Sequence, residues 1–282
     1  MLVIKKIEVL GKYLSRQREL GNSIGFVPTM GALHEGHIAL IQTSLSAHDT
    51  TVCSIFVNPT QFNEASDFDA YPSTISADIK VLEQKGCQVL FLPAVDEIYP
   101  KTDYQKPSFN FNGLDLAMEG AFRPGHFEGV GEVIKRFLDL LDCDCMYLGE
   151  KDFQQVLIIK SVVEQCGFPV KVIPVPTQRA SSGLALSSRN LLLGKEYLEV
   201  APEIYQSLLH VKENFNGENL NTLLADASNR INATNKLKVE YLTAANAKTL
   251  EEVKQDVPEE LVICTAVWAG KVRLIDNIVL AN

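Results

Sequence analysis

Hydrophobic and polar positions follow two different periods along the first 177 residues of the chain. Strand-like runs are predicted at residues 23–27, 51–57, 89–92, 145–148 and 169–175. Segments with helical spacing alternate with them, at residues 5–20, 38–45, 74–86, 130–141 and 154–165. Strands and helices that alternate in this way predict an α/β fold with a Rossmann-like doubly wound parallel sheet.

The pattern changes beyond about residue 184. A long amphipathic helix over 196–214 that tolerates Pro202, a second helix over 220–233 and strand-like runs at 239–242, 262–267 and 272–275 predict a smaller α+β domain. We therefore expect two domains, residues 1–177 and residues 184–282. Residues 94–127 lose periodicity over a stretch too long for an ordinary loop, which favours a functional lid or insertion.

Composition and charge exclude several classes of function. The 282 residues carry a formal net charge of −9, which argues against a nucleic-acid partner. The chain has no apolar run long enough to span a membrane and no signal-peptide pattern at its first residues, so we expect a cytoplasmic protein without a membrane partner. The six cysteines are scattered, as free thiols are, and Cys143 and Cys145 lack a partner pair at zinc spacing.

The segment from Pro28 to His37 joins an apolar strand to a helix and contains two glycines and two histidines. Free backbone N–H groups at such a junction bind phosphate, and glycine lets the anion approach closely. His34 and His37 lie three residues apart and can donate hydrogen bonds to the same anion. The alternative is two ordinary surface histidines in a glycine-rich turn.

Polar residues also follow the strand predicted at 51–57. The amides of Asn58 and Gln61 can bind a substrate hydroxyl or carboxylate at the carboxyl end of the sheet. The alternative is that Asn58 starts a turn with Pro59 and Gln61 faces solvent.

Lys151 lies in a second strand-to-helix turn. A lysine at a helix start opposes the helix dipole, which indicates an anionic partner such as a phosphate. It could also be a solvated lysine paired with Glu150 or Asp152. Ser187, Ser188 and Arg189 lie in a polar loop over 178–190 and suit polyphosphate, although a serine there could simply cap a helix.

Arg123 and His126 leave two interpretations open. They could face an anion, or they could pair with Glu119 and Glu128.

The motif Pro-Thr-Met-Gly-Ala-Leu-His-Glu-Gly-His resembles the His-x-Gly-His signature of the nucleotidylyltransferase superfamily and, in full, the pantoate–β-alanine ligase family. Further segments resemble that family in the same order, at residues 54–62, 123–130, 149–155, 186–190 and 271–277. Two places depart from the family pattern. Ser73 replaces the usual arginine, and Ala180-Ser181-Ser182 replaces an acidic stretch.

The resemblance implies an ATP-dependent ligase that joins pantoate to β-alanine through a pantoyl adenylate, with ATP, Mg²⁺ on its phosphates and a homodimer. The catalytic residues that it implies are His34, His37, Lys151 and Arg189. The ATP-binding residues that it implies are Met30, Gly31, Ala32, Leu33, His34, Glu35, Gly36, His37, Gly149, Glu150, Lys151, Asp152, Gln178, Leu186, Ser187, Ser188 and Arg189. Pantoate would be held by Met30, Asn58, Gln61 and Gln155, and β-alanine by Gln61. The smaller domain would act as a lid, and the metal ligands are not identified.

Two other functions fit parts of the sequence. A nucleotidylyltransferase that modifies a phosphate would need a basic acceptor pocket, whereas the acceptor segment here offers amides. A nucleotide-binding module without catalysis would not need His34, His37 and Lys151. The sequence contains neither a Gly-x-x-x-x-Gly-Lys-Ser/Thr loop nor a Gly-x-Gly-x-x-Gly turn, the usual markers of P-loop NTPases and dinucleotide dehydrogenases.

Overall fold

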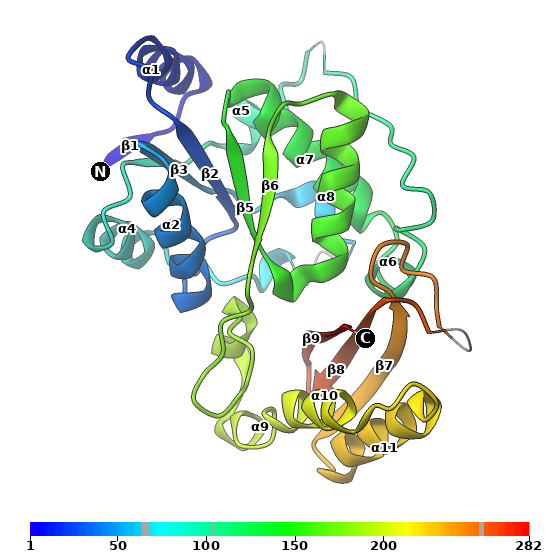
Figure 1. Ribbon diagram of the computed structural model, residues 1–282. Coiled ribbons are helices and arrows are strands. Elements are labelled where there is room, and N and C mark those ends of the chain that lie inside the picture. Colours follow the sequence, from blue (N-terminus) through cyan, green and yellow to red (C-terminus); the bar gives the residue numbers. More distant parts are fainter. Residues whose placement is uncertain (64–67, 103, 254–256, 282) are drawn as a thin grey trace.

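Two β-sheets organise the chain (Figure 1). The computed structural model describes residues 1–63, 68–102, 104–253 and 257–281. In this part of the chain the first sheet contains β1 (Leu2–Ile4), β2 (Ile24–Thr29), β3 (Thr50–Ile55), β4 (Val89–Phe91), β5 (Cys145–Gly149) and β6 (Lys171–Val175). The helices that accompany it are α1 (Ile7–Glu19), α2 (Glu35–Ala47), α4 (Ile75–Gln84), α5 (Val95–Ile98), α6 (Met118–Phe122), α7 (His126–Leu140) and α8 (Phe153–Cys166), with short 3-10 turns η1 (Pro59–Gln61) and η2 (Glu150–Asp152).

The strand order confirms the doubly wound parallel sheet. The order is β1-β4-β3-β2-β5-β6, and each described pair of neighbours is parallel. From β2 the chain builds β3 and β4 on one side, and β5 and β6 on the other. The direction of winding therefore reverses between β2 and β5, and ligands of such sheets bind beyond the carboxyl ends of the strands at this switch point.

Helices cover both faces of the first sheet. On one face, α1, α7 and α8 bury apolar side chains such as Leu10, Phe137 and Ile159 against the strands. On the other face, α2 and α4 bury Ile41 and Leu82. Because both faces are covered, the strands read as continuous apolar runs in the sequence.

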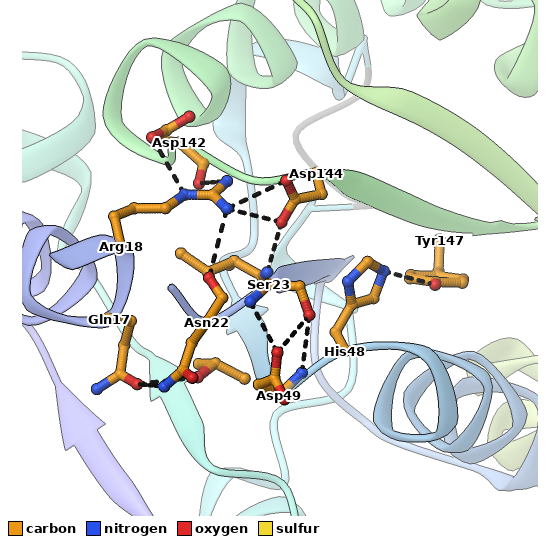
Figure 2. A network of polar contacts seen from close by, with 11 residues as sticks. Gln17, Arg18, Asn22, Ser23, His48, Asp49, Asp142, Asp144 and Tyr147 are labelled. Atoms are coloured by element: carbon orange, nitrogen blue, oxygen red, sulfur yellow. Dashed lines mark hydrogen bonds and ion pairs between the residues drawn. The ribbon is translucent and has the colours of Figure 1, made fainter. Parts of the chain in front are cut away.

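An ion network fixes the amino ends of the two strands at the switch point, as Figure 2 shows. Arg18 of α1 donates to both carboxylate oxygens of Asp144, at 3.1 and 2.8 Å. Asp144 also accepts the backbone N–H of Ile24 at 2.6 Å, so the residue before β5 is bonded to the first residue of β2. This network lies at the end of the sheet opposite to the predicted site, and it holds β2 and β5 in register there.

The second sheet belongs to the C-terminal part of the chain, beyond the carboxyl end of β6 (Figure 1). It contains the antiparallel strands β7 (Leu237–Asn246), β8 (Glu260–Ala269) and β9 (Val272–Ala281). The helices α10 (Glu203–Asn214) and α11 (Leu220–Ala233) pack against this sheet through an apolar cluster that includes Leu208, Leu223 and Ile263. The predicted smaller α+β unit is therefore observed.

Two details of the predicted elements differ. The single helix expected over 196–214 is wrong, because the chain forms α9 (Lys195–Leu198) and then α10, with Pro202 at the N-cap of α10. Proline has no N–H for an interior helix bond and fits at a helix start. The edge strand β1 was not predicted. Residues 94–127, which we expected to be more than an ordinary loop, contain α5 and α6 and bury Ile98 and Phe111, while their role as a lid or insertion stays a prediction.

Among the described residues, no helix combines the length and the apolar character needed to cross a membrane.

Candidate functional site

Two strand-to-helix turns meet at the switch point of the first sheet. The first follows β2 and carries His34 and His37, and the second follows β5 and carries Lys151. Because β2 and β5 are paired neighbours, both turns leave the sheet at the same edge. They border a cavity of about 200 Å³, which we call the inner cavity. Its lining includes Met30, His34, Gly36, His37, Asn58, Gln61, Gly149, Lys151, Asp152, Gln155, Gln178 and Leu186.

A larger cavity of about 720 Å³, the outer cavity, lies between the first sheet and the C-terminal sheet. It shares Met30, Gln61, Lys151, Asp152 and Gln155 with the inner cavity, and it adds Ser187 and Arg189. The structure therefore brings the predicted catalytic residues His34, His37, Lys151 and Arg189 to two adjoining cavities.

The hydrogen bonds of the two histidines define where each ring carries its proton. His34 is the N-cap of α2, and its Nδ1 accepts the N–H of Gly36 at 3.1 Å. The N–H of His34 donates in turn to Nδ1 of His37 at 3.3 Å, and the two ring centroids are 4.0 Å apart. Since both Nδ1 atoms accept, each neutral ring carries its hydrogen on Nε2.

Both rings are neutral near pH 7. Burial, together with the nearby Lys151 ammonium, lowers the pKa of His34 to about 4. Burial and the neighbouring His34 and Lys151 lower the pKa of His37 well below its usual value. The two Nε2–H groups are therefore hydrogen-bond donors of fixed tautomer for an anion, rather than imidazolium acids.

Several backbone amides before the start of α2 already have acceptors within the protein, whereas phosphate binding by the amides at the helix start stays a prediction. The buried Asp78 of α4 accepts the N–H groups of Ala32 and Leu33, at 3.0 and 2.9 Å. The N–H of Gly31 contacts Thr29 Oγ1 at 3.2 Å. The N–H groups of residues 31–33 thus hold the backbone of the turn in place. This backbone includes Ala32 in the left-handed region, with a φ of 49°. The exposed Glu35 pairs with Lys85 at 3.8 Å.

Lys151 fits both interpretations made from the sequence. Its Nζ lies 3.3 Å from Asp152 Oδ1, and its side chain also lines both cavities with only 17% of its surface exposed. A largely buried ammonium beside a single carboxylate can bind a further anion. Glu150, Lys151 and Asp152 form the turn η2 that precedes α8.

The amide of Asn58 is used in holding Gln61. Its Nδ2 donates to Gln61 Oε1 and to the carbonyl of Gly129, both at 3.1 Å, and its Oδ1 accepts the hydroxyl of Tyr99 at 2.8 Å. The Oε1 atom of Gln61 is occupied by the hydrogen bond from Asn58. The Nε2 group of Gln61, which lies 3.2 Å from the sulfur of Met30, is therefore the part of this amide that can meet a ligand. Gln61 therefore presents an N–H donor to the cavity, while Asn58 orients it.

The two neighbouring glutamines of α8 have different surroundings. Gln155 lines both cavities. Gln154 is buried, donates to the carbonyls of Leu114 and Ala117 and accepts the N–H of Glu119 at 3.0 Å. The helix thus presents Gln155 to a ligand and uses Gln154 to hold residues 114–119.

The loop over 178–190 closes the site from the other side. Ser187 caps the 3-10 turn η3 (Ser188–Leu192), as its alternative interpretation predicted, by accepting the N–H of Arg189. Ser188 Oγ donates to the carbonyl of Ala32 at 2.9 Å and so ties this loop to the histidine turn. Leu186 and Gln178 are joined by a backbone hydrogen bond and line the inner cavity.

His126 and Arg123 pair with each other. His126 Nδ1 donates to the carbonyl of Gln61 at 2.8 Å, and Nε2 lies 3.3 Å from a guanidinium nitrogen of Arg123. Burial, with the charge of Arg123, lowers the pKa of His126 to about 4. Glu119 pairs with Arg273 of β9, a partner that the sequence did not suggest. Both Arg123 and His126 line the outer cavity.

Comparisons with known proteins agree with one another over the whole chain. Residues 2–279 match the family model described as pantoate–β-alanine ligase. The chain is 42% identical over 280 residues to pantothenate synthetase of Azobacteroides pseudotrichonymphae, with 99% of each chain covered. It is 41% identical over 279 residues to pantothenate synthetase of Bacteroides fragilis, with 99% of this chain and 98% of the relative covered.

Solved structures give the same result. The crystal structure of pantothenate synthetase from Thermus thermophilus is similar with a TM-score of 0.87, 35% identity and 99% of each chain covered. Pantoate–β-alanine ligase from Francisella tularensis, complexed with β-γ ATP and β-alanine, is similar with a TM-score of 0.83 and 37% identity, covering 99% of this chain and 97% of that one. The fold, the two turns at its switch point and these matches lead to one conclusion: the chain belongs to the pantoate–β-alanine ligase family.

Proposed function

We propose that the two cavities bind pantoate and ATP side by side and that their residues drive the ligase reaction in two steps. In the first step a carboxylate oxygen of pantoate attacks the α-phosphorus of ATP, and the bond to the β-phosphate oxygen breaks, which releases pyrophosphate. In the second step the amine of β-alanine attacks the acyl carbon of pantoyl adenylate. AMP leaves, the amine loses a proton, and pantothenate forms.

The observation that carries this proposal is the mixed lining of the inner cavity. The lining includes the apolar side chains of Phe56, Val133 and Phe137 and the amides of Gln61 and Gln155. It also includes His34, His37 and Lys151. Pantoate has a dimethyl carbon, two hydroxyls and a carboxylate, so the apolar and amide groups fit its body, and the histidines and the lysine fit the phosphates that its carboxylate must reach.

In this proposal the charges of ATP are distributed over three elements. Lys151 stabilises the α-phosphate, and the Nε2–H groups of His34 and His37 bind the departing phosphates as neutral donors. Ser187 and Arg189 bind the polyphosphate from the outer cavity, whereas the buried Ser188, expected from the sequence to join them, holds the loop to the histidine turn. Positioning and electrostatic stabilisation are the main contributions that a protein makes to such a transfer.

The rival enzyme, a nucleotidylyltransferase with a phosphate acceptor, fits the same cavity less well. An acceptor phosphate would need basic side chains beside the apolar part of the lining. Among the described residues, the lining of the inner cavity contains no arginine. Amides and apolar side chains favour an uncharged body with hydroxyls over a second phosphate.

Mg²⁺, the homodimer, the lid role of residues 184–282 and a cytoplasmic location remain parts of the proposal that rest on the resemblance. Within the described ranges, no group of three or more His, Cys, Asp or Glu residues is placed to hold a metal ion. We propose that Mg²⁺ is bound mainly by the ATP phosphates, as is usual for this ion.

The direct test follows pyrophosphate release from ATP with pantoate alone and then with β-alanine added. We expect release that depends on pantoate, and pantothenate only when β-alanine is present. In Lys151→Ala, His34→Ala and His37→Ala the rate should fall by about a hundredfold to a thousandfold, the usual effect of removing a group that stabilises the transition state.

The matched control is Lys135→Ala, which removes a lysine of α7 that pairs with Asp139 on the helix surface. Its rate should equal that of the native protein. Pyrophosphate release without any dependence on pantoate would contradict the proposed substrate, and full activity of the Lys151 variant would contradict the proposed site.

A further inference from the structure

Strand β9 carries the segment Arg273-Leu274-Ile275-Asp276-Asn277, whose side chains have no role in the proposed reaction. Three of them contact residues outside the C-terminal sheet. Arg273 contacts Glu119, Asp276 contacts Arg179, and Asn277 contacts the turn η2. One strand therefore connects the C-terminal sheet to several elements around the cavities.

Asn277 holds the backbone of the phosphate-binding lysine itself. Its Nδ2 donates to the carbonyl of Glu150 and to the carbonyl of Lys151, each at 2.9 Å. Its amide group has two hydrogens, so each carbonyl can receive one. Asn277 is buried, which means that water cannot easily replace these bonds if they are lost.

Asp276 holds the other phosphate-binding element. Its two carboxylate oxygens accept from the guanidinium of Arg179 at 2.6 and 2.9 Å, and Oδ1 also accepts the N–H of Asn277 at 2.8 Å. Arg179 starts the stretch that leads to Ser187 and Arg189, and its guanidinium lies 3.6 Å from the ring centroid of Tyr205. Adjacent residues of β9 are thus bonded to the turn that carries Lys151 and to the loop that carries Ser187 and Arg189, the two elements that are proposed to bind the phosphates.

Arg273 fixes the same strand at a third point. Its guanidinium donates to both carboxylate oxygens of Glu119, at 2.6 and 2.8 Å, and to Glu240 at 2.7 Å. Glu119 is in turn bonded to Gln154 of α8. The turn η2 is therefore held directly by Asn277, and the start of α8, which follows it, is connected to Arg273 through Gln154 and Glu119.

We propose that Asn277 is a positioning residue for the adenylation step, which holds Lys151 against the α-phosphate and, with Asp276, couples the C-terminal sheet to both phosphate-binding elements. This inference rests on the proposed function. It follows from geometry, because the carbonyls that Asn277 binds belong to Lys151 and to the residue before it. A displacement of about 1 Å at a reacting group can lower a rate by about a hundredfold.

The variant Asn277→Asp tests the idea with almost no change in shape. It replaces the two donors with a carboxylate oxygen that faces two carbonyls. We expect the kcat for pantoate-dependent pyrophosphate release to fall by about a hundredfold. The KM for pantoate should change much less than kcat, because Gln61, which is proposed to bind pantoate, is held by Asn58 and not by Asn277.

Asn232→Asp is the matched control. Asn232 lies in α11 of the same part of the chain, and its Oδ1 accepts the N–H of Val239 at 3.0 Å, a bond that a carboxylate can keep. It adds the same charge and should leave kcat unchanged. If Asn277→Asp does not fold, as judged by circular dichroism, Asn277→Ser keeps one donor in a smaller side chain and should show an intermediate loss of kcat.

A double-mutant cycle separates positioning from a general structural effect. If Asn277 acts through Lys151, Asn277→Asp should lower the rate little or not at all in the Lys151→Ala background. An equal fold-loss in both backgrounds would overturn the inference, as would native kcat in Asn277→Asp.

The same variants distinguish a failure of the proposed reaction from a failure of the proposed role of Asn277. A native protein that releases no pyrophosphate with pantoate would contradict the proposed function. ATP affinity, measured by calorimetry without the reaction, would then test Asn277 alone. We expect Asn277→Asp to bind ATP more weakly than the native protein, and the double variant to bind ATP as weakly as Lys151→Ala alone. Native ATP affinity in Asn277→Asp would refute the proposal that Asn277 positions Lys151.

Discussion

Replacing Asp78 with asparagine is expected to loosen the turn that carries both histidines. Asp78 is buried, and its two oxygens accept the N–H groups of Ala32 and Leu33 and the hydroxyl of Thr74, at 3.0, 2.9 and 3.1 Å. These bonds also hold Ala32 at a positive φ, which is unfavourable for a residue with a side chain. The variant keeps the size of the side chain and removes one of the two acceptors.

The expected loss of stability follows from the hydrogen bonds that the carboxylate of Asp78 accepts and the amide cannot. A hydrogen bond to a charged group contributes about 1.5–3 kcal/mol, and asparagine turns an NH₂ group toward a buried N–H that has no other acceptor. We therefore expect Asp78→Asn to lower the free energy of unfolding by about 2–3 kcal/mol. Pyrophosphate release should also fall, because His34 and His37 follow directly after this turn.

Urea unfolding, followed by circular dichroism, measures the first effect. Asp139→Asn is the control, since Asp139 is partly exposed and pairs with Lys135 one helical turn away. An exposed pair of this kind contributes about 0.3–0.5 kcal/mol. A loss in Asp78→Asn no larger than that of the control would refute the idea that Asp78 holds the turn.

Three further predictions follow from other contacts. Tyr99→Phe removes the hydroxyl that binds Asn58, so Asn58 should hold Gln61 less firmly. We expect the KM for pantoate, measured by steady-state kinetics, to rise several-fold. The pKa of His126 is about 4 in the folded protein, below its unfolded value, so this residue contributes stability above about pH 6.5 that is lost as the pH falls toward 4. The urea midpoint of His126→Gln should therefore change less over that window than that of the native protein. Removal of Mg²⁺ with EDTA should abolish pyrophosphate release, and added Mg²⁺ should restore it, whereas full activity in EDTA would exclude the ion.

Local sequence patterns predicted the features that depend on local geometry. The period of apolar residues located β2, β3 and β5, because buried parallel strands are continuous apolar runs. The glycines and histidines after β2 marked the turn that the structure places at the switch point. The edge strand β1 was missed because it has three residues, and two of them, Leu2 and Val3, are exposed.

The residues that hold the site in place had no such signal. Asp78 contacts a turn that is 45 residues away in the sequence, and Asn277 contacts a residue that is 126 positions away. Each looks like an ordinary polar residue in its own element. Only the packing of α4 and of β9 against the switch point gives these side chains their partners, so periodicity and motif spacing could not reveal them.

Asp78 also changes how an anion can bind at the histidine turn. Its carboxylate accepts two of the backbone N–H groups that such a turn normally offers to a phosphate, and it adds a negative charge beneath the site. Side chains supply further donors around the turn. They are the Nε2–H groups of His34 and His37, the ammonium of Lys151 and the guanidinium of Arg189. The placement of Lys151 and Arg189 depends on the contacts that hold η2 and the 178–190 loop. Strand β9 is bonded to both of them, so the position of the C-terminal sheet should determine how strongly the site can stabilise a departing phosphate.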